Sequence, residues 1–312
     1  MKIKFLFIIA LILVGSSAYC QVKSEAFQKA SDAFDRGDYQ KSIELIDNAL
    51  KTDSLNLDYL MLKGFSHEKA AQYQEAYDSY SLGIQAHPAH AWPYNQRGLL
   101  LKSLKETELS IKDFDAALAF EKSDSLRLGL LLNRGAAKID IRDFHGAYND
   151  FEAALKIDSL DVGLLNNIAA VSDEVGKGDQ TLGYLYKIIR IDSTFLGGYG
   201  NIGFKHQQMG DHQEAIKYFN IVLEKDPDDA LSYSNRAYSL YKLGKTKEAL
   251  ADINRSIKLY PGNSYAYRTR ALIYLFMEDN KKACEDIAES LKQGFTKMYG
   301  GEVETLQSRF CN

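Results

Sequence analysis

The amino-acid sequence predicts an all-α solenoid of eight helix–turn–helix repeats, preceded by an export signal and closed by a short C-terminal capping helix. Three observations lead to this prediction. Small and large residues recur with a 34-residue period through most of the chain. Only 4 of the 312 residues are proline, which leaves room for long uninterrupted helices. The first 20 residues have the composition of a signal peptide.

Residues 1–20 are expected to direct export and to be removed. Lys2 and Lys4 form a positive start, an unbroken apolar run covers residues 5–14, and small residues at 15–18 precede a cleavage site after Cys20. The apolar run is shorter than the roughly 20 residues that a membrane-spanning helix needs.

A lipoprotein, anchored through an acylated Cys20, is the alternative to cleavage that leaves Gln21 as the N-terminus. Lipoprotein signals typically have Gly, Ala or Ser directly before the acylated cysteine, whereas this sequence has Tyr19 there. This difference favours plain secretion. We therefore expect an exported protein, in the periplasm or on the surface of a Gram-negative bacterium, with lipid anchoring less favoured.

The charge balance argues against nucleic acid as a partner. The full chain has a net charge of -4, and without Lys2 and Lys4 it would keep 36 basic and 42 acidic residues. Binding to phosphates needs a basic field, which this composition does not supply.

The repeat is defined by a column of small residues in the middle of each expected first helix. Successive members lie 34 residues apart, except for one step of 37 that places an insertion near residues 123–125. We number this column position 8 of units that start at residues 23, 57, 91, 128, 162, 196, 230 and 264. Its members are Ala30, Gly64, Gly98, Gly135, Ala169, Gly203, Ala237 and Ala271.

Other columns describe how the two helices of a unit, helix A and helix B, should pack. Position 4 is mostly large, position 20 small and position 24 large, so small residues would let the backbones approach while large ones fill the space between. Position 15 falls in the turn and is often glycine, and three of the four prolines share position 32. The position-24 residues are Ile46, Tyr80, Phe114, Phe151, Leu185, Phe219, Ile253 and Ile287.

This pattern of columns resembles the tetratricopeptide-repeat (TPR) family from residue 23 to about residue 297. The resemblance implies a right-handed superhelix whose concave groove, lined by helices A, binds extended peptides or partner helices. The remaining residues 298–312 are expected to cap the open end of the array, with Val303, Leu306 and Phe310 on one face of a short helix.

Positions 2, 6 and 9 of helix A are the candidate groove residues. Asn side chains at position 6 could hold a peptide backbone, glycines at position 2 would leave room for it, and apolar residues at position 9 could receive side chains. Asn at position 6 is also common across the family, so a role in the fold stays open. The candidates are Asn133, Asn167, Asn201, Asn235, Gly129, Gly163, Gly197, Phe204, Tyr238 and Leu272.

Two other binding modes stay open, and one is disfavoured. Trp92, Tyr238, Tyr241 and Tyr265 could offer flat faces to sugar rings, which would make the protein a glycan-binding accessory protein. Weak self-association through the terminal repeats is a further possibility. A basic clamp for acidic tails is disfavoured, because these groove positions hold almost no basic residue beyond Arg268.

The sequence contains no convincing catalytic, cofactor or metal motif. We therefore expect a non-catalytic scaffold for protein–protein interaction. Gly198, Gly200 and Gly203 match the dinucleotide fingerprint letter for letter, but a helix precedes them where the fingerprint requires a strand. The histidines lack the spacing of a metal site.

Removal of Cys20 would leave two cysteines, Cys284 in the last helix B and Cys311 after the cap. An even number in an exported protein favours a disulfide, and two free thiols are the alternative.

Overall fold

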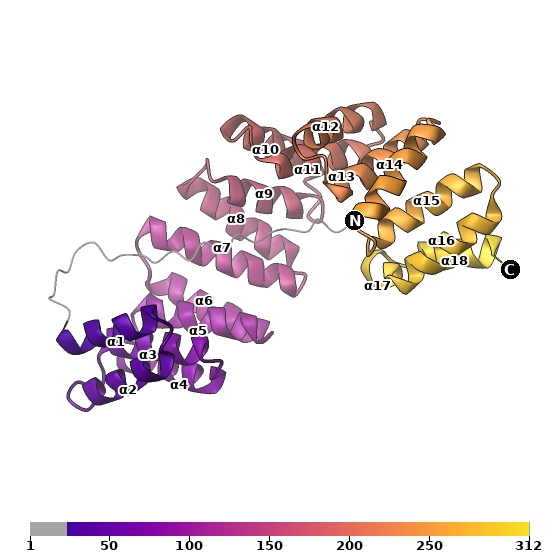
Figure 1. Ribbon diagram of the computed structural model, residues 1–312. Helices are drawn as coiled ribbons and strands as arrows, with labels where there is room; N and C mark the ends of the chain where they lie inside the picture. The colour runs from indigo at the N-terminus through magenta and orange to yellow at the C-terminus, as the bar shows by residue number, and fades with distance from the viewer. Residues whose placement is uncertain (1–23, 312) are drawn as a thin grey trace. The chain divides into compact units, whose positions relative to one another are not determined.

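The computed structural model describes residues 24–311, which form eighteen α-helices with no strand among them (Figure 1). The prediction of an all-α repeat fold is confirmed. The expected signal peptide, with Cys20 and Gln21, lies outside the described residues, as does Asn312.

The first four repeats make up one compact unit, which ends at Leu164, and we call it the N-terminal unit. Within it each helix B packs against the helix A of its own repeat and against the helix A of the next. Its helices are α1 (Glu25–Asp35), α2 (Tyr39–Leu50), α3 (Leu57–Lys69), α4 (Tyr73–Ala86), α5 (Ala91–Ser103), α6 (Thr107–Phe120), α7 (Asp124–Asp140) and α8 (Phe144–Ile157).

The C-terminal unit begins at Leu165, inside α9 (Val162–Ser172), and holds the last four repeats and the cap. Helix packing follows the same rule from α10 to α16. The other helices are α10 (Gly178–Ile191), α11 (Leu196–Gln208), α12 (His212–Lys225), α13 (Ala230–Lys242), α14 (Thr246–Leu259), α15 (Ser264–Phe276), α16 (Asn280–Lys292), α17 (Phe295–Tyr299) and α18 (Glu302–Phe310).

Each repeat is held together by a small residue at position 8 packed against a large one at position 24. A Cβ atom added to Gly203 would lie 2.8 Å from the ring of Phe219, and one added to Gly135 would lie 2.5 Å from the ring of Phe151. Both rings are fully buried. These distances leave no space for a methyl group, so the column of small residues reflects close helix–helix contact.

The turn between helix A and helix B requires a left-handed backbone at position 15 in every repeat. Four repeats place glycine there, with φ between 73° and 83°, and glycine adopts this conformation without steric cost. The other four repeats place larger residues in the same strained region: Ala71 (φ 58°), Lys105 (φ 68°), Arg142 (φ 64°) and Glu278 (φ 61°).

The insertion in the fourth repeat lengthens a helix rather than a loop. Helix α7 begins at Asp124, four residues before the expected start at residue 128, and reaches 17 residues. The extra residues therefore add a turn to the start of helix A.

The cap covers the last repeat as a small apolar cluster. Phe295 of α17 and Val303 of α18 are buried against Ala271 and Ile287, with Leu306 packed beside them. A disulfide joins Cys284 of α16 to Cys311, which follows α18, with the two Cα atoms 5.5 Å apart. The end of the chain is thus held on the last helix B by apolar contact and by a covalent bond.

Candidate functional site

Two of the four position-6 asparagines bind the preceding repeat through their side chains. All four lie on the helix-A face, the surface formed by positions 2, 6, 9 and 13 of helices A. The amide nitrogen of Asn133 donates to Oδ1 of Asn95 at 3.2 Å, and that of Asn201 donates to Oδ1 of Asn166 at 2.9 Å. Each acceptor lies at position 5 of the preceding repeat. Asn133 and Asn201 therefore have a role in the fold, which the sequence had left open, because these bonds tie adjacent helices A together.

Asn235 is the most buried of the four, with 4% of its surface exposed. Its main-chain carbonyl accepts a 2.6 Å hydrogen bond from the Gln207 side chain, which also donates to Ser239. The side-chain oxygen of Asn235 is buried without a hydrogen-bond partner among the described residues. Asn167 is half-buried. Asn235 therefore cannot reach an extended peptide on the surface without a local opening.

The glycines at position 2 differ in the room that they leave. Gly163 and Gly197 are exposed and Gly129 is half-buried. Above Gly197, however, the ring of Phe195 lies 3.1 Å from where a Cβ would stand. The space that we expected a bound backbone to use at Gly197 is partly filled by the chain's own side chain.

Four repeats share a partly buried ion pair that the sequence reasoning missed. An arginine at position 7 binds the aspartate at position 23 of the same repeat through Nε and Nη2, and its Nη1 donates to position 25 of the preceding repeat. We call this arrangement the arginine staple. The pairs are Arg97–Asp113, Arg134–Asp150, Arg236–Asp252 and Arg270–Asp286, with Nη1 acceptors Ser81, Asp115, Asn220 and Asn254.

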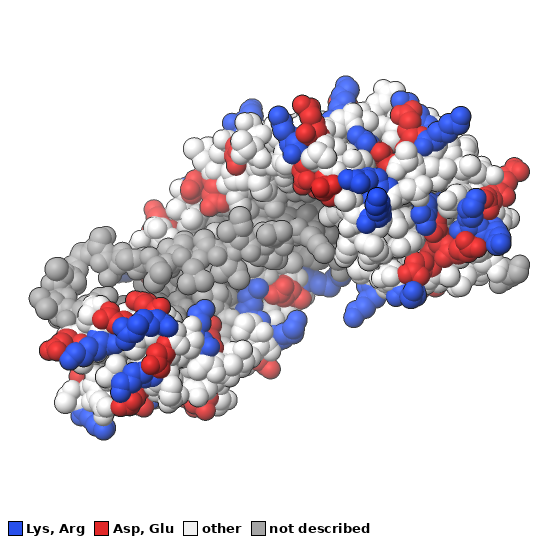
Figure 2. Space-filling model, viewed as in Figure 1, with Lys and Arg blue, Asp and Glu red and all other residues white. Residues whose placement is uncertain are grey.

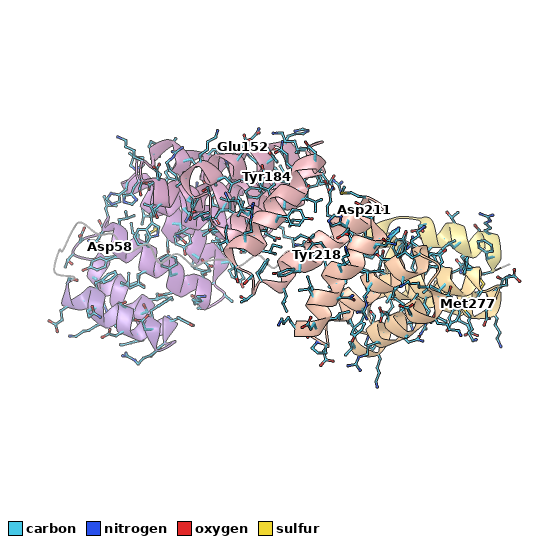
Figure 3. The ribbon with its side chains drawn as sticks, turned by 90° about the horizontal axis from the view of Figure 1, so that it is seen from above. Asp58, Glu152, Tyr184, Asp211, Tyr218 and Met277 are labelled. Atoms are coloured by element: carbon cyan, nitrogen blue, oxygen red, sulfur yellow. A yellow bond between two sulfur atoms is a disulfide. The ribbon has the colours of Figure 1, made fainter. Side chains whose placement is uncertain are left out.

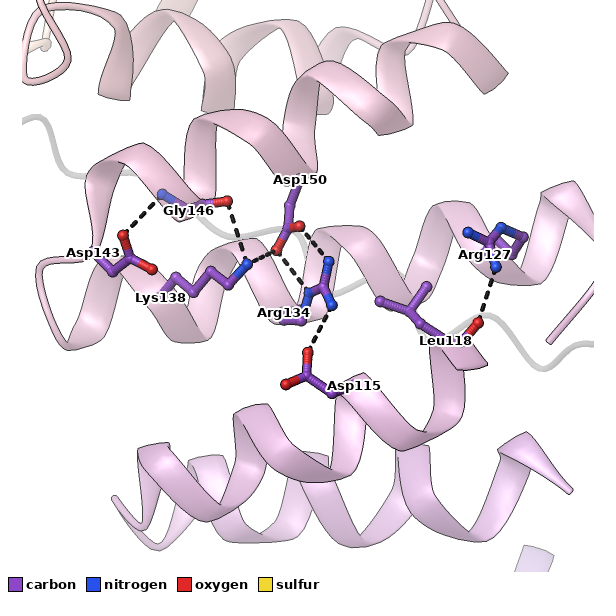
Figure 4. Close-up of polar contacts among 8 residues, drawn as sticks. All are labelled: Asp115, Leu118, Arg127, Arg134, Lys138, Asp143, Gly146 and Asp150. Carbon is purple, nitrogen blue, oxygen red and sulfur yellow. Dashed lines mark hydrogen bonds and ion pairs between the residues drawn. The ribbon is translucent and has the colours of Figure 1, made fainter. Parts of the chain in front are cut away.

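Figure 4 shows the staple of the fourth repeat, where Arg134 lies between Asp150 and Asp115 at N–O distances of 2.6 to 3.0 Å. Lys138 adds a second ion pair to Asp150. A constant spacing of sixteen residues between Arg and Asp is the signal that could have revealed the staple from sequence.

A tyrosine–histidine network replaces the staple in the sixth repeat. Position 7 is Ile202, and Tyr218 at position 23 donates a 3.5 Å bond to Tyr186 at position 25 of the repeat before. His206 stacks on Tyr218, bonds Tyr186 through Nε2 at 3.0 Å and approaches Asp211 through Nδ1 at 3.4 Å (Figure 3 labels Asp211 and Tyr218). Burial and the bond to Tyr186 raise the pKa of Tyr218 to about 12.

The helix-A face of the C-terminal unit holds a pocket of about 320 Å³, which we call the C-terminal pocket. Five helices contribute to its wall, including both helices of the cap. Of the candidates from sequence, Phe204 and Tyr238 line this pocket, whereas half-buried Leu272 does not. The lining residues are Phe204, Gln207, Gln208, Tyr238, Tyr265, Arg268, Phe295, Tyr299 and Glu302.

Arg268 is the cation of this pocket and is held on three sides. Its guanidinium carbon lies 5.3 Å from the ring centre of Tyr238 and 5.6 Å from that of Tyr265. Nε and Nη2 bind the two carboxylate oxygens of Glu302 at 3.2 and 2.5 Å. Burial opposes the charge, but the bonds with Glu302 and the electrostatic interaction with Tyr265 and Tyr238 raise the pKa of Arg268 above its ordinary value.

Comparisons with known proteins agree with this repeat architecture. A family model for the tetratricopeptide repeat matches residues 27–91 and 205–264. The chain has the tetratricopeptide-repeat fold. RNA polymerase II-associated protein 3 of Xenopus tropicalis is 30% identical over 95 residues, which make up 30% of this chain and only 14% of that relative.

Solved TPR structures share the fold at low sequence identity. A tetratricopeptide repeat protein from Parabacteroides merdae aligns with a TM-score of 0.68 at 18% identity, over 81% of this chain and 99% of that chain. YrrB, described as a TPR protein with an unusual peptide-binding site, aligns with a TM-score of 0.51 at 21% identity, over 62% of this chain and 98% of its own. TPR proteins are in general scaffolds that bind protein partners.

The aromatic rings that could have offered faces to sugars are tilted with respect to their neighbours. Tyr238 meets Tyr241 at an interplanar angle of 55° and Tyr265 at 49°. Trp92 lies in the other unit, where it packs at 45° to Phe65. Glycan binding by stacking requires roughly coplanar exposed rings, so this geometry disfavours the glycan alternative.

The TPR surface is mixed in charge. On the face shown in Figure 2, Lys and Arg side chains lie interspersed with Asp and Glu. Within residues 24–311, no cluster of His, Cys, Asp and Glu could hold a metal ion. Across the same residues, each helix is too short or too polar to cross a bilayer.

Proposed function

We propose that this TPR protein is a non-catalytic scaffold that binds a peptide or an extended protein segment along the helix-A face of its C-terminal unit. The C-terminal pocket is the observation that carries the proposal. It combines aromatic faces, a buried cation and amide groups within one hollow on the surface that the TPR family uses for binding.

The chemistry of the pocket suits side chains of a peptide. The ring centres of Tyr265 and Tyr299 are 5.9 Å apart, and Tyr238 lies 6.4 Å from Tyr265, so three tyrosines surround one space. Tyrosine gives a large apolar contact area at low entropic cost and keeps a hydroxyl for hydrogen bonds. The unusual peptide-binding site of YrrB is consistent with such a role on a TPR scaffold.

The proposal includes export, because the first 20 residues have the pattern of a signal peptide. Intact-mass measurement of protein from the native host checks this part. A chain that begins at Gln21 and carries no lipid is expected, and a mass that fits an acylated Cys20 would overturn plain secretion.

The binding test compares two variants of the exported protein in affinity capture from the cell envelope. Tyr238→Ala combined with Tyr299→Ala removes two walls of the pocket, whereas Tyr73→Ala removes an exposed tyrosine from the N-terminal unit. The captured partner is then titrated against each variant. We expect the pocket variant to bind about thirtyfold more weakly or worse, the loss typical of an aromatic hot spot, and the control to bind like the wild type.

Melting curves of both variants accompany the titration. A folded pocket variant that binds the partner with wild-type affinity would reject the C-terminal pocket as the binding site.

A further inference from the structure

Arg268 is a buried cation with its guanidinium turned to the C-terminal pocket. Only 9% of its surface is exposed, and the rings of Tyr238 and Tyr265 hold it in place. A buried guanidinium requires an anionic partner, because leaving it unpaired costs several kcal/mol. Whatever occupies the pocket must therefore keep this charge paired.

The anion that now pairs with Arg268 comes from the cap. Glu302, in the first turn of α18, places its carboxylate flat against Nε and Nη2 in a bidentate contact. The Glu302 side chain keeps 47% of its surface exposed, against 10% for the Arg268 side chain. One partner of the pair is thus fixed in the wall, and the other reaches it from the solvent side.

We infer that the C-terminal pocket is a receptor for a peptide carboxylate, and that Glu302 occupies it as an internal substitute for that ligand. This inference rests on the proposed peptide-binding function and names the group that the pocket recognises. Binding exchanges one carboxylate for another: Glu302 turns to water and the incoming carboxylate takes the two N–H donors.

Release of Glu302 costs little free energy, whereas its replacement at Arg268 requires an anion of a particular geometry. A half-exposed carboxylate such as Glu302 is already partly hydrated, so its release costs little. Arg268 remains buried, so only a planar anion that can accept two parallel N–H bonds replaces Glu302 well. Among the described residues, Nη1 of Arg268 has no hydrogen bond and could contribute a further donor to a ligand.

Competition by Glu302 makes the wild-type receptor weak. A ligand binds only the fraction of molecules in which the internal carboxylate has moved away, so the apparent affinity falls by that fraction. Replacing Glu302 by its amide removes the negative charge but keeps the shape of the side chain. We therefore expect Glu302→Gln to bind acidic peptides more tightly than the wild type does.

The experiment measures retention of synthetic peptides on immobilised protein. One pool of N-acetylated, C-terminally amidated octapeptides carries Glu at a central position among random residues other than Asp and Glu, and a second pool carries Gln there. A third pool has Gln and a free C-terminal carboxylate, which separates a terminal from a side-chain source. The matched control variant is Glu304→Gln, which removes an equal charge from the same helix but faces Thr296 instead of Arg268.

Glu302→Gln should retain at least one carboxylate pool about tenfold more strongly than the wild type does. A factor of this size is typical of one hydrogen-bonded contact with a charged group. Glu304→Gln should behave like the wild type, and Arg268→Gln combined with Glu302→Gln should lose the gain. If that double variant does not fold, the comparison of the two single variants decides alone.

Equal retention of the Glu and Gln pools by folded Glu302→Gln, with no gain for the third pool, would overturn the carboxylate inference while leaving peptide binding intact. Failure of every pool on every folded variant would remove the proposed function as well. Retention of an oligogalacturonate without retention of either carboxylate pool would assign the site to a glycan and also overturn the inference.

Discussion

Glycine at the four strained turns should stabilise the array. Ala71, Lys105, Arg142 and Glu278 all hold the left-handed conformation that the turn between helix A and helix B demands. For an L-residue this conformation costs about 1–2 kcal/mol, which glycine avoids. Glycine loses about 0.5–1 kcal/mol more chain entropy on folding, so the net gain is about 0.5–1 kcal/mol a site.

The gains should add, because each site lies in a different repeat. Ala71→Gly and Lys105→Gly should each give close to the full gain. Arg142→Gly should give the least, since the guanidinium lies 5.5 Å from the Phe144 ring and that contact, worth about 0.5 kcal/mol, is lost. The triple variant of the N-terminal unit should gain about 1–2.5 kcal/mol.

Urea unfolding followed by far-UV circular dichroism measures the effect as a shift of the midpoint. Ala251→Gly is the control, because this exposed alanine lies in the middle of α14 and glycine there should cost about 1 kcal/mol. The reasoning fails if the triple variant unfolds at the wild-type midpoint or below it while the control behaves as expected.

Three further changes test the packing. Asp286→Ala should lower the free energy of unfolding by about 2–4 kcal/mol in urea titrations, because it leaves Arg270 without its anionic partner. Gly203→Ala should lower the melting temperature, because the added methyl group overpacks against the Phe219 ring and costs about 1–3 kcal/mol of stability. Gly183→Ala should raise the melting temperature, because no atom lies within 4 Å of the added methyl group. Reductant should cost the C-terminal unit about 3–4 kcal/mol in wild-type protein through loss of the Cys284–Cys311 bond, and a variant with both cysteines changed to serine should no longer respond.

The repeat fold could be predicted from sequence because each position is sampled eight times. A glycine at position 8 says little alone, but eight small residues in register require close helix contact, and the packing of Gly203 on Phe219 bears this out. The start of α7 was misplaced because an insertion has no copy in the other repeats to show whether it extends the helix or the loop.

The candidate site was harder to predict because it depends on contacts between repeats and with the cap. Periodicity placed the position-6 asparagines on one face but could not show that Asn201 reaches Asn166 of the repeat before. The pair of Arg268 and Glu302 joins a repeat to a segment outside the period. Such a contact has no second example along the chain from which a pattern could be recognised.

The arginine staple gives the array a direction along the chain, which affects how the array can be truncated or joined to other repeats. Every staple takes its Nη1 acceptor from the preceding repeat, so the third and seventh repeats each donate one such bond to the repeat before and accept another from the repeat after. The last repeat, which no repeat follows, has Ala288 at position 25, where its neighbour has Asn254. A chimera that joins repeats from different sources must therefore place an acceptor at position 25 before each staple arginine. A truncation after the seventh repeat removes Arg270 and leaves the side-chain oxygen of Asn254 without its donor.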